Sequence, residues 1–203
     1  MIPHGALDYL TRLPDAAPLP PELARVSGPV VLFFGLIRPY KGLDVLVEAF
    51  RAVEGAELWV VGRPLGVNPV RLVAPLGSRA RLVARFVADR ELPAYLRRAD
   101  LVVLPYRDAE QSGVLYTALA FGKAIVVCDV GGFGEVAAIG AARLVPAENP
   151  AALALAIREL IADRAARERL EAGAREAAAG PYSWDEVAAR TLALYRGLGE
   201  AGG

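Results

Sequence analysis

Two cationic side chains follow the first apolar run of the chain, where they could bind a phosphate group. Residues 30–34 form a short run of β-branched, aromatic and leucine residues that predicts a buried strand, and Gly35 ends it. Arg38 and Lys41 lie in the loop that follows, directly before a helical pattern. Arginine binds phosphate oxygens in pairs, lysine acts as a point charge, and free amides at a helix start favour an anion. The alternative interpretation is a solvated basic loop.

A second candidate anion site lies at the start of another helical pattern, after residue 112. The loop 105–112 ends in Gln111 and Ser112 and leads to Gly113 and Val114. Ser112 could cap the helix, while the amides of Gly113 and Val114 would face a ligand. Neither loop matches the glycine fingerprint of dinucleotide-binding proteins or that of P-loop proteins.

Strands alternate with helices along most of the chain, which predicts a parallel sheet with helices on both faces. The runs are continuously apolar, as in sheets buried on both sides. We expect strands at residues 30–34, 58–61, 81–86, 101–104, 124–128 and 143–145, and helices near 41–53, 68–76, 90–98, 113–121 and 133–139.

Residues just after each predicted strand are the site candidates, because ligands of open parallel sheets bind at the carboxyl ends of the strands. Besides the two loops above, this position is held by Gly62 and Arg63 after the second strand and by Asp89 after the third. Arg63 is either a phosphate contact or a surface charge. Asp89 is either a ligand contact or a helix N-cap.

After residue 145 the pattern becomes wholly helical. Asn149 is predicted to cap a helix that has Pro150 at its first position, and a second helical stretch follows over 163–179. Ser183 begins the last helix, with Glu186 three residues on, as in a capping box.

Composition narrows the functional classes. Apolar residues make up 55% of the 203-residue chain and the formal net charge is zero, which argues against nucleic acid or an anionic membrane surface as main partner. One cysteine, Cys128, and one histidine, His4, leave no multi-ligand metal site of these residue types. Without an apolar run long enough to cross a bilayer or a signal-peptide pattern, we expect a soluble, cytoplasmic protein.

An ordered series of short motifs resembles the C-terminal half of the family 4 (group 1) glycosyltransferases, which are retaining enzymes of GT-B fold. The opening residues 2–5 and the closing residues 182–184 are similar to the segments that enter and leave this half, so the resemblance covers nearly the whole chain. The motifs are Gly35 with Lys41-Gly42, Val61-Gly62, Ala99-Asp100-Leu101, Leu104-Pro105, the stretch 118–126, and Gly131-Gly132-Phe133-Gly134-Glu135.

The resemblance implies a Rossmann-like domain that binds a nucleotide-activated sugar. Prolines at positions 3, 14, 18, 20 and 21 predict an irregular lead-in over residues 1–28, and we expect the Rossmann-like domain over 29–180 and a C-terminal helix and tail over 181–203. Lys41 matches the family's diphosphate contact. The family's arginine directly after the glycine is replaced by Leu36, and Arg38, two residues later, could supply the charge.

Two carboxylates of the family are also missing. The family's paired glutamates, eight residues apart, fall on Ala109 and Thr117. Glu110 lies beside the first position, and Thr117 can bond a hydroxyl group but offers no carboxylate. Asp89 matches a region in which the family reads the nucleotide base.

The expected chemistry is transfer of a sugar, with Lys41 and Arg38 stabilising the leaving diphosphate and no metal or other cofactor. The remaining substrate-binding candidates are Gly35, Gly62, Arg63, Asp89, Glu110, Gln111, Ser112, Gly113, Val114 and Thr117. The acceptor-binding half that normally precedes this one is expected to be a separate or missing partner, so the chain alone should be inactive or weakly active. The alternative is a non-catalytic nucleotide-binding protein or a pseudo-enzyme subunit.

Overall fold

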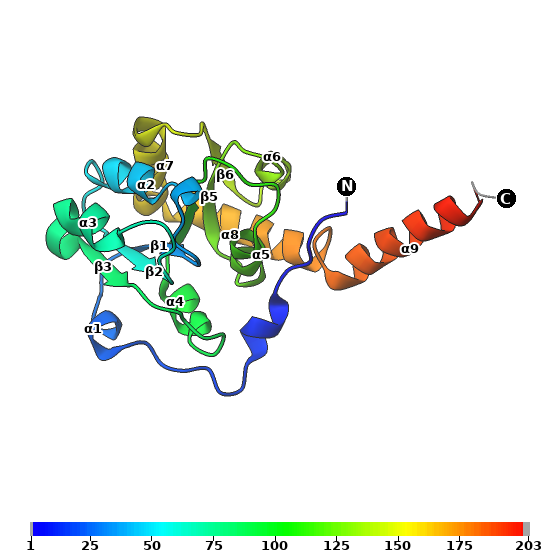
Figure 1. The fold of residues 1–203 in the computed structure, drawn as a ribbon, viewed down its shortest axis with the longest axis horizontal. Helices are drawn as coiled ribbons and strands as arrows, with labels where there is room; N and C mark the ends of the chain where they lie inside the picture. The colour runs from blue at the N-terminus through cyan, green and yellow to red at the C-terminus, as the bar shows by residue number, and fades with distance from the viewer. Residues whose placement is uncertain (1, 201–203) are drawn as a thin grey trace.

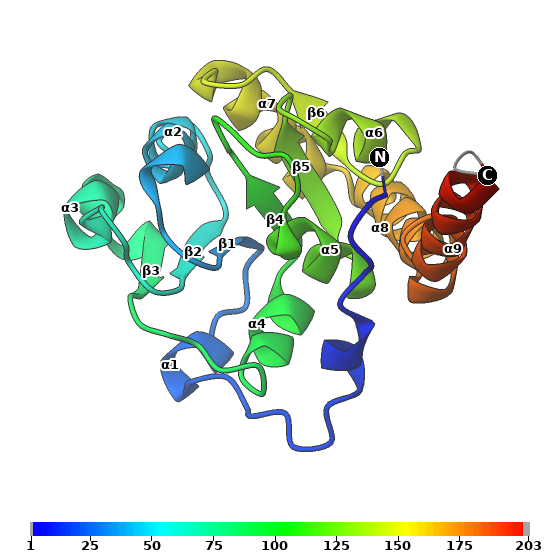
Figure 2. The ribbon, with the colours of Figure 1, turned by 45° about the vertical axis from the view of Figure 1, so that its right-hand side comes forward.

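The computed structural model describes residues 2–200, with side chains to residue 197. At the centre of this part of the chain lies a parallel six-stranded sheet. The sheet is drawn in Figure 1, and Figure 2 labels each strand of the order β3-β2-β1-β4-β5-β6. This confirms the predicted α/β class and the predicted sheet. The strands are β1 Val30–Phe34, β2 Glu57–Val61, β3 Ala80–Val83, β4 Leu101–Leu104, β5 Ala124–Cys128 and β6 Arg143–Val145.

Helices cover both faces of this sheet, as expected for continuously apolar strands. α2, α3, α7 and the first part of α8 pack on one face, and α4, α5, α6 and the last part of α8 on the other (Figure 2). Their bounds are α2 Leu43–Phe50, α3 Pro69–Val73, α4 Leu92–Arg98, α5 Gly113–Ala120, α6 Phe133–Ala138, α7 Pro150–Ala162 and α8 Arg164–Ala179, with the 3-10 helices η2 Pro39–Lys41 and η3 Ala74–Arg79.

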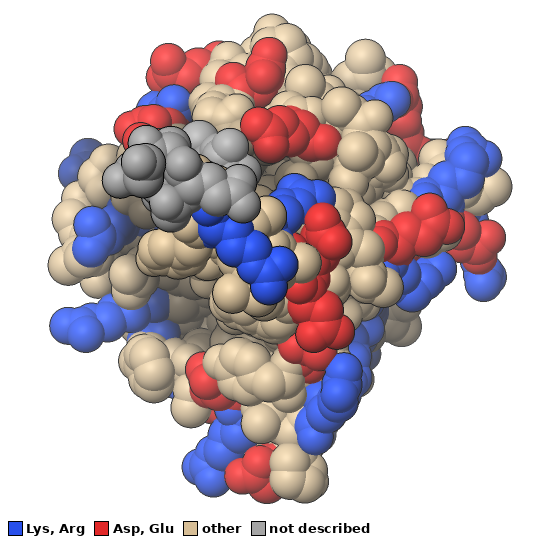
Figure 3. Space-filling model, turned by 90° about the vertical axis from the view of Figure 1, so that its right-hand side faces the viewer, with Lys and Arg blue, Asp and Glu red and all other residues tan. Residues whose placement is uncertain are grey.

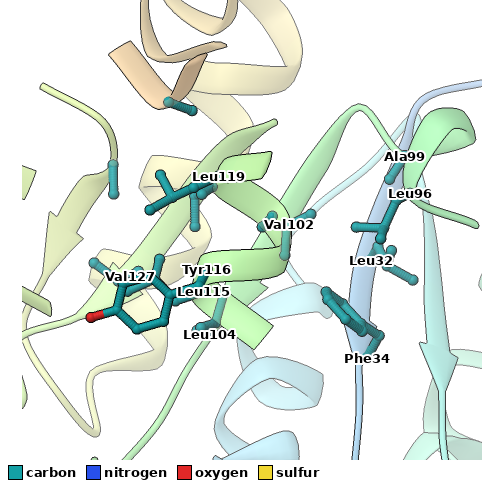
Figure 4. Packing of buried hydrophobic residues seen from close by; sticks show 14 of the residues in the cluster. Leu32, Phe34, Leu96, Ala99, Val102, Leu104, Leu115, Tyr116, Leu119 and Val127 are labelled. Carbon is teal, nitrogen blue, oxygen red and sulfur yellow. The ribbon is translucent and has the colours of Figure 1, made fainter. Parts of the chain in front are cut away.

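Each face of the sheet has its own apolar core because successive side chains of a strand point to opposite sides. In β1, Leu32 and Phe34 belong to one core, whereas Val31 and Phe33 belong to the other. Figure 4 shows the first core, where Leu115 and other side chains of α5 pack toward the strands. Burial of a large aliphatic or aromatic side chain contributes about 1.5–3 kcal/mol, so these two cores fix the strand positions and hence the loops that leave them.

The main difference from the predicted elements is the length of β3. The apolar run predicts a strand over 81–86, but β3 ends at Val83. Its last ladder bond runs from the amide of Gly62 to the carbonyl oxygen of Val83, at 2.9 Å. β2 has ended by then, so the edge strand β3 has nothing further to pair with, and Phe86 lies 69% exposed.

Two of the predicted helix caps, at Asn149 and Ser183, are confirmed. The Asn149 side chain accepts a hydrogen bond from the amide of Ala152, at 2.9 Å. The Ser183 hydroxyl accepts one from the amide of Glu186, at 3.2 Å. The Glu186 carboxylate accepts from Arg190 at 2.8 Å, so the side chain does not complete the capping box at the helix start.

The lead-in is more ordered than its prolines indicate. It contains η1 Asp8–Arg12 and the one-turn α1 Pro21–Ala24, and it buries Ala6 and Leu10. A Cβ atom placed on Gly5 would lie 2.6 Å from the Trp184 ring, so the first residues of the lead-in lie directly on the start of the last helix.

That last helix is α9, Trp184–Glu200, and it extends away from the body of the fold (Figure 1). Among the described residues, no helix is both long and apolar enough to cross a bilayer. The predicted boundaries at residues 28 and 180 stay predictions, and residues 1 and 201–203 of the outer parts lie outside the described residues.

Candidate functional site

A cavity of about 610 Å³ lies between the loop after β1 and the loop after β4. It contains both predicted anion-binding features, because Lys41 lines one side and Ser112, at the start of α5, lines the other. The full lining is Leu36, Tyr40, Lys41, Tyr106, Asp108, Ala109, Glu110, Gln111, Ser112, Gly113 and Val114.

The two loops meet because the strand order reverses between β1 and β4, so that the chain leaves these neighbouring strands in opposite directions. Close backbone contacts hold them together. Gly42 has φ +67°, and a Cβ atom there would lie 1.9 Å from the carbonyl oxygen of Pro105. The amide of Arg107 donates to the carbonyl oxygen of Tyr40 at 2.8 Å. These main-chain contacts help to fix the shape of the cavity.

Lys41 is a buried cation that rests on an aromatic ring. Lys41 is only 6% exposed, and its Nζ atom lies 5.0 Å from the centroid of the Tyr106 ring. No carboxylate among the described residues forms an ion pair with it. Burial, reinforced by the charge of Arg38, lowers the pKa of Lys41 to about 8. The ammonium is thus charged at neutral pH and available to an anion.

The start of α5 faces the same space without a side-chain cap. Ser112 occupies the N-cap position, but its side chain does not bond the helix amides, contrary to the predicted cap. Its hydroxyl instead contacts the Tyr106 hydroxyl at 3.5 Å. The first amides of a helix have no partner within the helix, so those of Gly113 and Val114 remain available at the cavity wall.

Gly35 and Arg38 lie near Lys41 but do not line the cavity. A Cβ atom on Gly35 would lie 3.3 Å from Lys41 Nζ and 2.9 Å from the Val114 side chain, so only glycine leaves these two groups together. Arg38 is half-buried, and its Nε atom is buried without a hydrogen-bond partner. The structure thus places Arg38 beside Lys41 and behind the cavity surface.

Four further candidates lie away from the cavity lining. Gly62 packs against the Gly35 carbonyl oxygen, which a Cβ atom at Gly62 would approach to 1.8 Å. Arg63 is exposed beyond it. Asp89 accepts a hydrogen bond from the Tyr9 hydroxyl at 2.9 Å and does not cap α4, which has Glu91 at that position. The Thr117 hydroxyl donates to the Gly113 carbonyl oxygen at 2.6 Å, inside α5.

Sequence reasoning missed residues next to the candidates that line or support the cavity. Tyr106, in the loop after β4, is 2% exposed and lies beneath Lys41. Leu36 and Asp108 also line the cavity. No local pattern marks these roles, since they arise from contacts between loops about 65 residues apart in the chain.

The single cysteine and the single histidine of the chain both lie outside the cavity lining. Cys128 is 1% exposed, and burial raises the pKa of its thiol to about 11, so it is a small buried apolar residue. The His4 ring stacks on Tyr116 with a centroid distance of 5.3 Å. Among residues 2–200, no three histidine, cysteine, aspartate or glutamate side chains are grouped so as to hold a metal ion.

Comparison with known proteins gives consistent matches. Residues 28–163 match the family model of the "Glycosyl transferases group 1". The D-inositol 3-phosphate glycosyltransferase of Xylanimonas cellulosilytica is 37% identical over 178 residues, covering 84% of this chain and 42% of that protein.

Solved structures share the fold over almost the whole chain. Sucrose-phosphate synthase of Thermosynechococcus elongatus is 26% identical with a TM-score of 0.80, covering 98% of this chain and 52% of that one. The Anabaena protein HepE, solved in complex with UDP, is 22% identical with a TM-score of 0.77, covering 97% and 56%. The chain therefore spans about half the length of the proteins it matches.

Proposed function

Because the chain belongs to the family of group 1 glycosyl transferases, we propose that its cavity binds the diphosphate of a nucleotide-activated sugar. The observation that carries this proposal is that Lys41, a buried cation without a carboxylate partner, shares one cavity with the uncapped start of α5. A point charge and a row of free amides converging on one space suit a pyrophosphate group.

The proposed reaction is retaining transfer of a glycosyl group from this donor. The bond between the anomeric carbon and the diphosphate oxygen breaks, and negative charge develops on the leaving diphosphate. Lys41 and the amides of Gly113 and Val114 would stabilise that charge more strongly in the transition state than in the ground state. Arg38 would act from behind Lys41 by adding positive potential.

Carboxylates in the loop 105–112 are our candidates for the sugar hydroxyls. Asp108 and Glu110 both line the cavity. The position of the family's second glutamate holds Thr117, whose hydroxyl already bonds Gly113 within α5, so Thr117 is a poor replacement for a glutamate. We propose Glu110 as the residue that accepts hydrogen bonds from the sugar.

The chain would then be the donor-binding half of the enzyme. It spans about half of its relatives, and its likeness to the UDP-bound HepE covers 97% of it. An acceptor-binding half, supplied elsewhere, would complete the reaction cleft. Uridine diphosphate is the first nucleotide to test, with guanosine and adenosine diphosphates as alternatives.

Isothermal titration of the purified chain with these nucleotides tests the proposal. Replacing Lys41 by Ala should weaken diphosphate binding by about 1–3 kcal/mol, because a charged hydrogen bond is lost. Arg71→Ala is the control, since Arg71 is exposed on α3 away from the cavity. An affinity that Lys41→Ala leaves unchanged would place the ligand elsewhere and overturn the proposal.

The second candidate function is nucleotide binding without sugar transfer. It is favoured by Ala109 and Thr117 at the positions of the family's two glutamates, since these two side chains provide no carboxylate. The same titration separates the two functions. A sugar-binding site should hold UDP-sugar and UDP with different affinities, whereas equal affinities would favour the non-catalytic alternative.

A further inference from the structure

Arg107 joins the wall of the cavity to both neighbouring loops. Its Nη1 and Nη2 atoms donate to the two carboxylate oxygens of Asp44, at 2.8 and 2.7 Å. Nη1 also donates to the carbonyl oxygen of Pro39 at 3.0 Å, and Nε donates to Glu148 at 2.8 Å. A single guanidinium thus ties the loop after β4 to the loop after β1, to the first turn of α2 and to the loop after β6.

The third of these partners has an unusual backbone. Glu148 has φ +51°, the left-handed region that residues other than glycine rarely adopt. Such a conformation persists where surrounding contacts determine it, and the ion pair with Arg107 is a contact of that kind. The Asp44 and Glu148 side chains are 51% and 66% exposed, so the specificity of the arrangement rests on the paired contact of the guanidinium with Asp44.

On the inner side of the same loop, the preceding residue faces Lys41. The Tyr106 ring is 2% exposed, lies 5.0 Å from Lys41 Nζ and touches the rings of Tyr40 and Phe133 at centroid distances of 6.0 and 5.5 Å. Arg107 and Tyr106 are adjacent, so the contacts that hold the Arg107 side chain restrict the backbone that carries the Tyr106 ring.

We propose that Arg107 is a positioning residue for the nucleotide cavity: by fastening the loop 105–112 to α2, it holds the Tyr106 ring against the Lys41 ammonium. The inference rests on the proposed function, because it concerns the same cavity. The ring stabilises the buried cation through its π face, without neutralising it as a carboxylate would. The charge of Lys41 then stays available to a diphosphate.

Titration with UDP and GDP at pH 7 tests the affinity that follows from this positioning. Arg107→Ala should raise Kd about tenfold, although Arg107 itself does not line the cavity. Arg107→Lys should give an intermediate Kd, because an ammonium cannot form the two-pronged contact with Asp44. The control is Arg81→Ala, which removes a similar paired contact with Glu57 near the other end of the sheet and should leave Kd unchanged.

The pH dependence of binding separates positioning from general support of the fold. The titratable and charged groups around Lys41 are Arg38 in its own loop, Tyr106 under its ammonium group, and Tyr40, Asp108 and Glu110, which line the same cavity. With its pKa lowered to about 8, wild-type affinity should fall as the pH rises through about 8, as the ammonium loses its proton. A loosened loop admits water, so in Arg107→Ala the midpoint should move upward. A merely structural role would lower Tm and leave the midpoint in place.

The outcomes distinguish this inference from the proposed function. If Lys41→Ala weakens binding while Arg107→Ala changes neither Kd nor the midpoint, the positioning role is wrong and the proposed function stands. If Lys41→Ala has no effect, the proposed function fails. If Arg107→Ala does not fold, Asp44→Asn takes its place in the same two measurements, Kd and the pH midpoint of binding. This substitution removes the negative charge of the Arg107 partner with little change of side-chain shape. An unchanged Kd and midpoint in Asp44→Asn would likewise overturn the inference.

Discussion

Lys41 is buried in the folded protein, and burial disfavours its charged form. Burial lowers its pKa from 10.5 to about 8, so the folded state binds this proton less strongly than the unfolded state does. Between these two pKa values the unfolded chain holds a proton that the folded chain has lost, and the free energy of unfolding therefore rises with pH. A binding residue here is also a destabilising residue at neutral pH.

Replacing Lys41 by Met should therefore stabilise the protein at pH 7 while weakening nucleotide binding. Methionine retains an unbranched apolar side chain against Tyr106 and removes the penalty of the buried charge, which should raise the free energy of unfolding by roughly 2 kcal/mol. The advantage over wild type should shrink toward pH 9.5, where wild-type Lys41 is neutral in the folded state. Urea denaturation at both pH values measures it.

Lys123→Met is the matched comparison for that experiment. Burial lowers the pKa of Lys123 as well, but its ammonium donates to the carbonyl oxygens of Arg97 and Ala99, at 3.3 and 2.8 Å. Its replacement leaves those oxygens without their partner, so Lys123→Met should destabilise the protein. Lower stability of Lys41→Met at pH 7 would contradict the account of Lys41.

The sequence alone could predict that Lys41 and Ser112 share a site, but not the directions of all candidate side chains. The first prediction needs only that both residues follow strands of one parallel sheet. Thr117 was expected to reach a ligand, yet its hydroxyl bonds Gly113 one turn earlier. Asp89 bonds Tyr9, which lies 80 residues away in the chain. Such partners depend on tertiary contacts that no local pattern contains.

At the scale of elements, Gly42 allows the loops around the cavity to approach. Gly42→Ala should destabilise the protein for two reasons, the positive φ of +67° and the clash with the Pro105 carbonyl oxygen. The left-handed conformation alone costs about 1–2 kcal/mol, and the clash adds to that. Thermal denaturation measures the sum, and titration with UDP should show weaker binding because the loops are pushed apart.

Gly55→Ala isolates the backbone contribution. Gly55 has φ +72°, but a Cβ atom there would meet nothing within 4 Å. This variant should lose only the conformational term and should bind UDP as wild type does. If Gly42→Ala and Gly55→Ala lost the same amount of stability, the loops after β1 and β4 would separate freely, contrary to the close packing described above.

The ends of a strand can be predicted from the sequence where the strand is fully buried. The prediction fails where the neighbouring strand has already ended. β1, β4, β5 and β6 begin and end at the predicted residues. The apolar run at 81–86 outlasts its neighbour β2, so β3 ends three residues early. Hydrophobic patterning records burial, whereas a strand also needs a hydrogen-bonding partner.

At the scale of the whole molecule, the motif order was enough to identify the family. The family match over residues 28–163 and the shared fold confirm the resemblance to the C-terminal half of group 1 glycosyltransferases. The acidic and basic residues of the chain balance to a formal net charge of zero. Over the described residues of the face in Figure 3, acidic and basic side chains are interspersed, and this face presents no uniform field that would attract a polyanion.

The chain spans about half of its relatives, so donor binding and sugar transfer should be separable in it. We expect UDP at one hundred times its Kd to stabilise the purified chain by about 2.7 kcal/mol through mass action, seen as a higher Tm. Under the proposed function, an acceptor-binding half supplied elsewhere is needed to complete the reaction cleft, so sugar release or transfer from UDP-sugar by the purified chain should stay slow. A robust transfer rate from the purified chain would show that it completes the reaction alone.

The contact of Gly5 with Trp184 gives the protein an internal optical reporter. Its two tryptophans lie in different surroundings, since Trp59 is fully buried beside Tyr95 whereas Trp184 is half exposed beneath the first residues of the chain. Detachment of those residues would alter the fluorescence of Trp184 alone, while the emission of Trp59 would change only when the sheet itself opens. One spectrum thus follows two separate events, the release of the chain's beginning and the melting of its centre.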